Sequence, residues 1–87
     1  MRIIKPVRLS RHAKEQAHYR GCSEEEIIEA INGSPWEQAE LGRLQSKKNF
    51  VFNAVWNDKK YQTKQVVPIF AEEMSEIVVI TVYVFYF

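Results

Sequence analysis

The chain has 87 residues, of which 46% are apolar and 26% charged, and its formal net charge is +1 at pH 7. This length accommodates one domain, residues 1–87, and the apolar content is sufficient for a hydrophobic core. The small net charge does not by itself identify a nucleic-acid-binding protein, and a single cysteine, Cys22, excludes an internal disulfide.

Charged residues are arranged in blocks along the chain. Residues 1–20 contain six Lys/Arg against Glu15, residues 21–41 contain six Glu and no basic residue, and residues 42–64 contain six Lys/Arg against Asp58. Two basic blocks that converge on one face of the fold would suit a polyanion, whereas the alternative is ordinary solvated charge.

The start of the chain does not resemble a signal peptide, because no apolar segment follows Arg2 and Lys5. The longest apolar run, residues 77–87, is shorter than the roughly 20 residues that a membrane helix requires. We therefore expect a protein of the reducing cytoplasm that has no membrane partner.

In chain order, residues 2–7 form a short lead-in that Pro6 stops, a candidate edge strand. The first helix is predicted to begin after the N-cap residue Ser10 and to end at Gly21. Its apolar stripe is narrow, so we expect its polar side to be available for function.

The second helix has stronger start signals. Ser23 and Glu26 form a capping box, and three glutamates in the first turn suit the helix dipole. The helix is predicted to end at Gly33, before Pro35.

From residue 36 onward the apolar pattern has the two-residue period of strands. Predicted strands cover residues 36–41, 49–56, 61–70 and 77–87, with a turn at residues 57–60. Pro68 has no backbone N–H, so it marks a strand end, a bulge or an edge. The sequence predicts an α+β domain in which two N-terminal helices pack on one face of a three- to four-stranded antiparallel sheet.

The last strand is apolar on both faces and is expected to pair with the middle strands. Its alternation assigns Val78, Ile80, Val82, Val84 and Tyr86 to one face, and Ile77, Val79, Thr81, Tyr83, Phe85 and Phe87 to the other. Thr81 and Tyr83 are ordinary strand residues, but they bring two hydroxyls to the same face. If the helices cover only one side of the sheet, this pair looks onto the open side.

His12 lies in the first turn of its helix, where the helix dipole disfavours an imidazolium and so favours a proton-accepting ring. It is a candidate general base, and an exposed surface histidine is the alternative. His18 lies on the opposite side of the helix and is expected to be solvated.

Arg20 lies beside the glycine that ends the first helix. Its guanidinium has two candidate roles, to hold a phosphate or to satisfy the last carbonyl groups of the helix. Arg43, Lys47 and Lys48 precede a predicted central strand, where they either reach a substrate over the sheet or serve as solvated loop residues.

Other chemical signatures are absent from the sequence. It contains no Gly-rich phosphate loop, no His/Cys/carboxylate set with metal-ligand spacing and no nucleophile elbow. We therefore expect neither a cofactor nor a metal.

Three stretches together resemble the DUF4258 family of small bacterial domains. They are Ser10–Ala13 at the start of a helix, Arg20–Gly21 followed by residues 23–27, and residues 80–83 in the last strand. That family is similar to the ribonuclease-toxin fold of the barnase-like, EndoU-like and RelE/ParE-like groups.

The resemblance implies a metal-independent endoribonuclease of toxin type that acts on RNA. His12 would transfer the proton of a ribose 2′-OH or of the leaving oxygen, and Arg20 would neutralise the phosphate with help from Lys47 or Arg43. Thr81 or Tyr83 would bind the phosphate or supply the second proton-transfer group.

Two other functions remain open. The first is a non-catalytic module in which residues 85–87 and a sheet edge bind an inhibitory protein partner or a second copy of the chain. The second is an RNA-binding domain that does not cleave.

Overall fold

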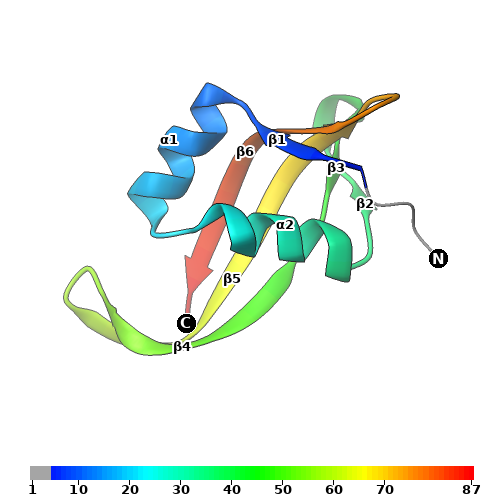
Figure 1. Cartoon of the computed structure of the whole chain (residues 1–87). Helices are drawn as coiled ribbons and strands as arrows, with labels where there is room; N and C mark the ends of the chain where they lie inside the picture. The colour runs from blue at the N-terminus through cyan, green and yellow to red at the C-terminus, as the bar shows by residue number, and fades with distance from the viewer. Residues whose placement is uncertain (1–4) are drawn as a thin grey trace.

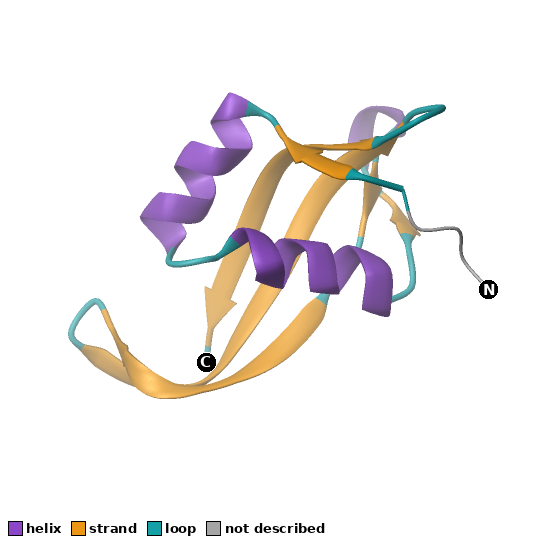
Figure 2. Cartoon of the chain, viewed as in Figure 1, coloured by secondary structure: helices purple, strands orange, loops and turns teal. Residues whose placement is uncertain are grey.

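The computed structural model describes residues 5–87, and it has the α+β architecture that the sequence predicts. In chain order the elements are β1 (Val7–Leu9), α1 (Arg11–Arg20), α2 (Glu24–Gly33), β2 (Glu37–Gln38), the 3-10 turn η1 (Glu40–Gly42), β3 (Leu44–Gln45), β4 (Lys48–Trp56), β5 (Lys59–Glu72) and β6 (Ile77–Tyr86). Both helices lie on the same face of the sheet, and η1 lies on its far side (Figure 1, Figure 2).

The capping residues of both helices are those that the sequence predicts. The Ser10 hydroxyl accepts a 3.0 Å hydrogen bond from the Ala13 N–H, and Gly21 ends α1 with a left-handed φ of 73°. Ser23 and Glu26 form both hydrogen bonds of a capping box at the start of α2. Neither helix of residues 5–87 has the length and apolarity needed to cross a membrane.

The sheet is larger than predicted and it is mixed. Six strands are present among the described residues, in the order β1-β6-β5-β3-β2, with β4 also paired to β5. The prediction of a purely antiparallel sheet is wrong, because β1 runs parallel to β6 along the first residues of that strand. Residues 2–4 of the predicted lead-in lie outside the described residues, and the edge strand that follows is β1.

Pro68 lies within a central strand and divides the strand beside it in two. Leu44 pairs with Phe70 and Lys48 pairs with Val66, so β3 and β4 keep the same register on β5 on either side of the break. Between them the Ser46 N–H donates to the Pro68 carbonyl at 3.4 Å. Proline cannot return that hydrogen bond, which explains why the ladder is interrupted here.

The predicted strand over residues 36–41 is mostly wrong. Only Glu37 and Gln38 pair with a neighbouring strand, and the chain then turns through η1 with Leu41 at φ 60°. The predicted turn at residues 57–60 is shorter than expected, because Asn57 and Asp58 alone form a two-residue hairpin turn with positive φ.

A β-bulge in β6 changes the predicted assignment of its two faces. Ile69 pairs with Thr81 and Phe70 pairs with Val79, so Ile80 is an extra residue in β6. Because of this extra residue, Val79 shares the helix-covered face with Val82, and both are fully buried. The alternation that assigned Ile77 and Val79 to the face of Thr81 is therefore wrong before the bulge and right after it.

The core lies between the helices and the β5–β6 pair. It is formed by Leu9, Ala13, Ala17, Cys22, Ile27, Ile31, Val66, Phe70, Ile77, Val79 and Val82. At the far end of the same face, Trp56 stacks on Tyr86 with ring centroids 5.0 Å apart. This contact anchors the β4–β5 hairpin, which extends beyond the helix-covered part of the sheet (Figure 1).

Candidate functional site

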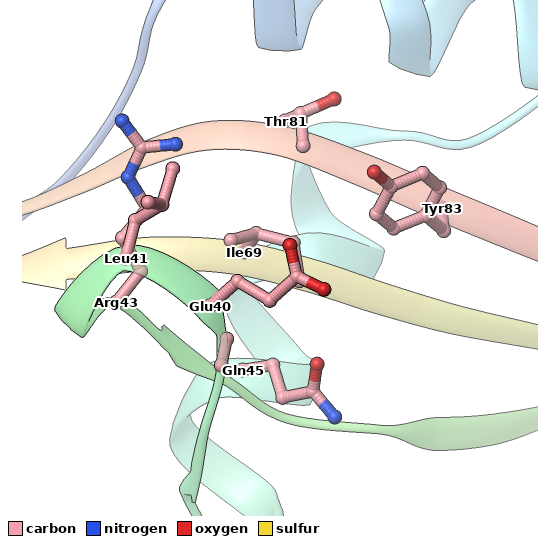
Figure 3. A pocket seen from close by; sticks show the side chains of 8 residues that line it. Glu40, Leu41, Arg43, Gln45, Ile69, Thr81 and Tyr83 are labelled. Atoms are coloured by element: carbon pink, nitrogen blue, oxygen red, sulfur yellow. The ribbon is translucent and has the colours of Figure 1, made fainter.

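The face of the sheet opposite α1 and α2 carries a pocket of about 270 Å³. Its lining comes from η1 and the residues around it, β3, β5 and β6, and consists of Ala39, Glu40, Leu41, Arg43, Gln45, Ile69, Thr81 and Tyr83. Figure 3 shows these side chains at the junction of η1 with the sheet. The prediction that Thr81 and Tyr83 look onto an open sheet face is confirmed.

Two local irregularities of the backbone build this pocket. The bulge at Ile80 sets the alternation of β6 so that Thr81 and Tyr83 face away from the helices. The turn at η1 is closed by hydrogen bonds from the Ala39 N–H to the Arg43 carbonyl (2.8 Å) and from the Arg43 N–H to the Glu40 carbonyl (3.2 Å). This turn holds one carboxylate and one guanidinium at the rim of the sheet.

The strand register brings polar side chains into rows on the open face. Gln45 pairs with Ile69, and Ile69 pairs with Thr81, so these three residues form one row across the sheet. Figure 3 shows the Glu40 carboxylate and the Tyr83 hydroxyl on the same side of Ile69. The pocket therefore combines a proton acceptor, a cation, an amide and two hydroxyls around an apolar floor.

Arg20 reaches this region from the end of α1. Its guanidinium donates a 2.9 Å hydrogen bond to the Val82 carbonyl and lies 5.3 Å from the centre of the Tyr83 ring. The predicted bond to the last carbonyl groups of the helix is not formed, because the guanidinium bonds to β6 instead. Arg20 therefore places a positive charge against Tyr83, beside the pocket.

The remaining predicted residues are divided between the two faces. His12 is exposed on α1 and does not line the pocket, and His18 is exposed as predicted. Lys48 points to the helix side, where its ammonium lies 3.4 Å from a Glu29 carboxylate oxygen. Lys47 is exposed and, by strand alternation, lies on the open face between Gln45 and Asn49.

Glu40 and Gln45 are pocket residues that sequence reasoning did not select. The misassigned strand over residues 36–41 concealed Glu40, because a strand would have made it one of several exposed glutamates. The sequence feature that could have located this turn is Gly42, because glycine readily adopts the left-handed conformation that it has here (φ 72°).

Three ionisable groups with shifted pKa values, Cys22, Glu26 and Tyr86, lie on the helix side around the buried Lys64. The Lys64 ammonium donates to the Gly21 carbonyl at 2.9 Å and pairs with the Glu26 carboxylate at 2.9 Å. Burial acts to raise the pKa of Glu26, but hydrogen bonds from the Ser23 backbone and from Lys64 outweigh it and lower that pKa.

Burial is also the main cause of two raised pKa values beside Lys64. It raises the pKa of the Cys22 thiol to about 12 and that of the Tyr86 hydroxyl to about 12. Both groups therefore remain neutral, as expected of side chains that pack in the junction between α1 and α2, and we assign neither a role in proton transfer.

No group of three or more His, Cys, Asp or Glu side chains in residues 5–87 is arranged to hold a metal ion. Comparison of the chain with protein-family models, curated proteins and solved structures finds no match. The functional argument therefore rests on the pocket and the open sheet face.

Proposed function

We propose that this protein is a metal-independent endoribonuclease of the RelE/ParE-like type, and that RNA is cleaved in the pocket on the open sheet face. The observation that carries the proposal is the combination of Glu40, Arg43, Thr81 and Tyr83 in one pocket, with the Arg20 guanidinium 5.3 Å from the Tyr83 ring. This set contains a proton acceptor, two cations and two hydroxyls, which is what cleavage of a phosphodiester by its own 2′-OH requires.

In the proposed reaction, Glu40 accepts the proton of the ribose 2′-OH while the 2′-oxygen attacks the phosphorus. The bond from phosphorus to the 5′-oxygen breaks, and the hydroxyl of Tyr83 or Thr81 donates a proton to the leaving oxygen. The products are a 2′,3′-cyclic phosphate and a free 5′-hydroxyl. DNA is not a substrate, because it lacks the attacking hydroxyl.

Arg43 and Arg20 have the electrostatic role in this reaction. Negative charge builds up on the non-bridging phosphate oxygens as the 2′-oxygen attacks, and a fixed guanidinium beside them lowers the barrier. Arg20 is held in place by its bond to Val82, so its charge needs little reorganisation during the reaction. Lys47, on the same face, contributes to phosphate binding outside the pocket.

This assignment differs from the one that the family resemblance implies for His12. The imidazole is exposed and outside the pocket lining, so we assign the proton-accepting role to Glu40. An endoribonuclease of toxin type would also be expected to arrest growth when its expression is induced, and to be inhibited by a protein partner.

Purified protein incubated with single-stranded RNA in the presence of a chelator tests the proposal. We expect Glu40→Gln to reduce cleavage by about 10²–10⁴-fold and Arg43→Ala by about 10²–10³-fold. His12→Ala is the matched control and should retain wild-type activity. An inactive His12→Ala variant beside an active Glu40→Gln variant would show that our assignment is wrong.

A second candidate function is self-association through a sheet edge. The outer edge of β4 has no strand partner among the described residues, and its Val51 side chain is 87% exposed. The edge of β6 is less available, because Ser10 and Arg20 occupy its Ile80 and Val82 carbonyl groups. A concentration-dependent dimer without RNA cleavage would favour this function.

A further inference from the structure

Three aromatic rings lie along β6 and its C-terminal extension on the open face of the sheet. Tyr83, Phe85 and Phe87 occupy every second position and are 45%, 52% and 57% exposed. The residue between the first two, Val84, instead packs against the core. The exposed rings form a line that begins at the pocket and leads away from it along β6.

The line of rings is not covered by another element of the described chain. Only Tyr86 is covered, because it points to the helix side and stacks on Trp56. Rings with this much exposed surface in a row call for a ligand that offers flat apolar faces at a matching interval.

Polar and positively charged groups flank the rings. Arg20 lies over Tyr83, and Lys47, between β3 and β4, is assigned to the same face of the sheet by the common register of these strands on β5. Beside Phe85 is Gln65, its strand partner, whose amide donates a 3.0 Å hydrogen bond to Asn49. Amides beside a ring can bond the edge of a base, and the cations can contact phosphates.

The charge on this face favours a polyanion over an acidic or apolar protein segment near the pocket. Arg20, Arg43 and Lys47 supply three positive charges, against the carboxylates of Glu40 and Glu37, and Glu37 lies at the outermost strand. The rings and the cations therefore call for a ligand with alternating phosphates and flat bases.

The interval between the rings selects single strands. Residues two apart in a strand are about 6.6–6.8 Å apart, whereas successive nucleotides in one strand of a duplex advance about 3.4 Å. Bases stacked in a duplex therefore cannot sit on successive rings. An extended strand with unstacked bases can place one base on each ring.

We infer that Phe85 and Phe87 form a stacking platform for unpaired nucleotides that flank the scissile phosphate, so that the substrate class is single-stranded and extended RNA. The inference rests on the proposed function only for the identity of the natural ligand. The platform itself recognises bases by stacking, which is tolerant of sequence and does not depend on the 2′-OH.

Binding to single-stranded DNA separates this inference from cleavage, because DNA cannot react by the proposed mechanism. The probe is a fluorescently labelled oligodeoxythymidylate of about six nucleotides, a length within the site sizes of known single-strand binders. We expect Phe85→Leu and Phe87→Leu each to weaken binding roughly tenfold, the effect of losing one stack. A duplex probe should bind more weakly than the single strand and be insensitive to both variants.

Two control variants sharpen the test. Phe85→Trp retains a flat ring on which a base can stack, so it should retain affinity, in contrast to Phe85→Leu. Met74→Ala removes an apolar side chain that is 98% exposed in the turn between β5 and β6, away from the rings, and should leave binding unchanged. Thermal unfolding of Phe85→Leu, which should match the wild type, checks that the variant is folded.

The outcomes distinguish the two proposals. Single-strand binding that depends on Phe85, with no RNA cleavage by the wild type, would contradict the nuclease proposal and support the stacking platform. RNA cleavage by the wild type, with no effect of either leucine variant on DNA binding, would contradict the stacking platform and support the nuclease proposal. A dimer that forms through these rings and excludes the oligonucleotide would also overturn the inference.

Discussion

The Tyr86 hydroxyl donates a 2.6 Å hydrogen bond to the carbonyl oxygen of Arg20. This bond ties the last turn of α1 to β6, and it fixes the backbone from which the Arg20 guanidinium extends to Val82 and Tyr83. The position of a residue that we assign to the site thus depends on a side chain of the opposite sheet face.

Tyr86→Phe should therefore affect both stability and activity. The variant leaves the Arg20 carbonyl without this donor, and we expect the free energy of unfolding to fall by about 1 kcal/mol. RNA cleavage should fall further than the loss of folded protein explains, because the Arg20 guanidinium is less well fixed. Urea unfolding and initial cleavage rates measure the two effects, and an unchanged rate would show that this bond does not position Arg20.

Two glycines with left-handed φ provide a matched test of steric contact. At Gly21 (φ +73°) and Gly42 (φ +72°), any residue other than glycine would have nearly the same backbone strain. A Cβ on Gly21 would lie 2.6 Å from the Trp56 ring and 2.8 Å from the Tyr86 hydroxyl, whereas one on Gly42 meets nothing within 4 Å.

We expect Gly42→Ala to cost about 1–2 kcal/mol from the left-handed conformation alone. Gly21→Ala should cost at least about 2 kcal/mol more, because Trp56 must move away from Tyr86. Thermal unfolding of both variants measures the difference, and equal losses would mean that the Trp56 ring moves at no cost.

The Glu26–Lys64 pair should make stability depend on pH in the acid range. The pKa of Glu26 is lowered in the folded protein, so its stabilisation is complete above the ordinary carboxyl value of 4.5 and is lost as pH falls through the folded value. Glu26→Gln should lower stability by about 1–3 kcal/mol at neutral pH and flatten the acid part of the profile. Glu25→Gln, an exposed neighbour in the same turn, should leave the profile close to that of the wild type.

Lys47 and Lys48 are adjacent in sequence but are assigned to opposite faces, so their variants separate the proposed RNA binding from folding. Lys47→Ala should weaken RNA binding and reduce its salt dependence by about one counterion. Lys48→Ala should leave RNA binding unchanged and lower stability by at most about 1 kcal/mol through loss of the Glu29 ion pair. Retention of RNA at several salt concentrations checks the pair, and equal effects of the two variants would argue against binding on the open face.

The Cys22 thiol should be unreactive in the folded protein. Burial raises its pKa to about 12, so the thiolate that reacts with alkylating reagents is scarce at neutral and mildly alkaline pH. Iodoacetamide should modify Cys22 slowly in the native state and quickly in urea, as followed by mass spectrometry. Rapid labelling of native protein would indicate that the α1–α2 junction opens readily.

The features that the sequence predicted are those encoded by neighbouring residues. Ser10, Gly21 and the Ser23–Glu26 capping box define both helices by local hydrogen bonds, and the β-branched run of β6 is typical of a central strand. The open sheet face followed from the two-residue period of that run. Each of these signals lies within a few residues of the element it defines.

The features that the sequence did not reveal depend on contacts between distant segments. Whether Pro68 marks an end or a break between β3 and β4 depends on which strand lies beside it, and the bulge at Ile80 depends on how β6 pairs with β5. Glu40 became a site candidate only when η1 was seen to fold back over the sheet. His12 illustrates the converse, since its local environment favoured a general base but its position on α1 leaves it outside the pocket.

The extra residue at Ile80 sets which side chains of β6 face the helices and which face the open side of the sheet. A side-chain substitution at any point along β6 leaves this division intact, whereas deletion of a single residue reverses the orientation of everything after it. Chains that keep this pocket should therefore keep the length of this segment, whereas the exposed side chains along it can differ.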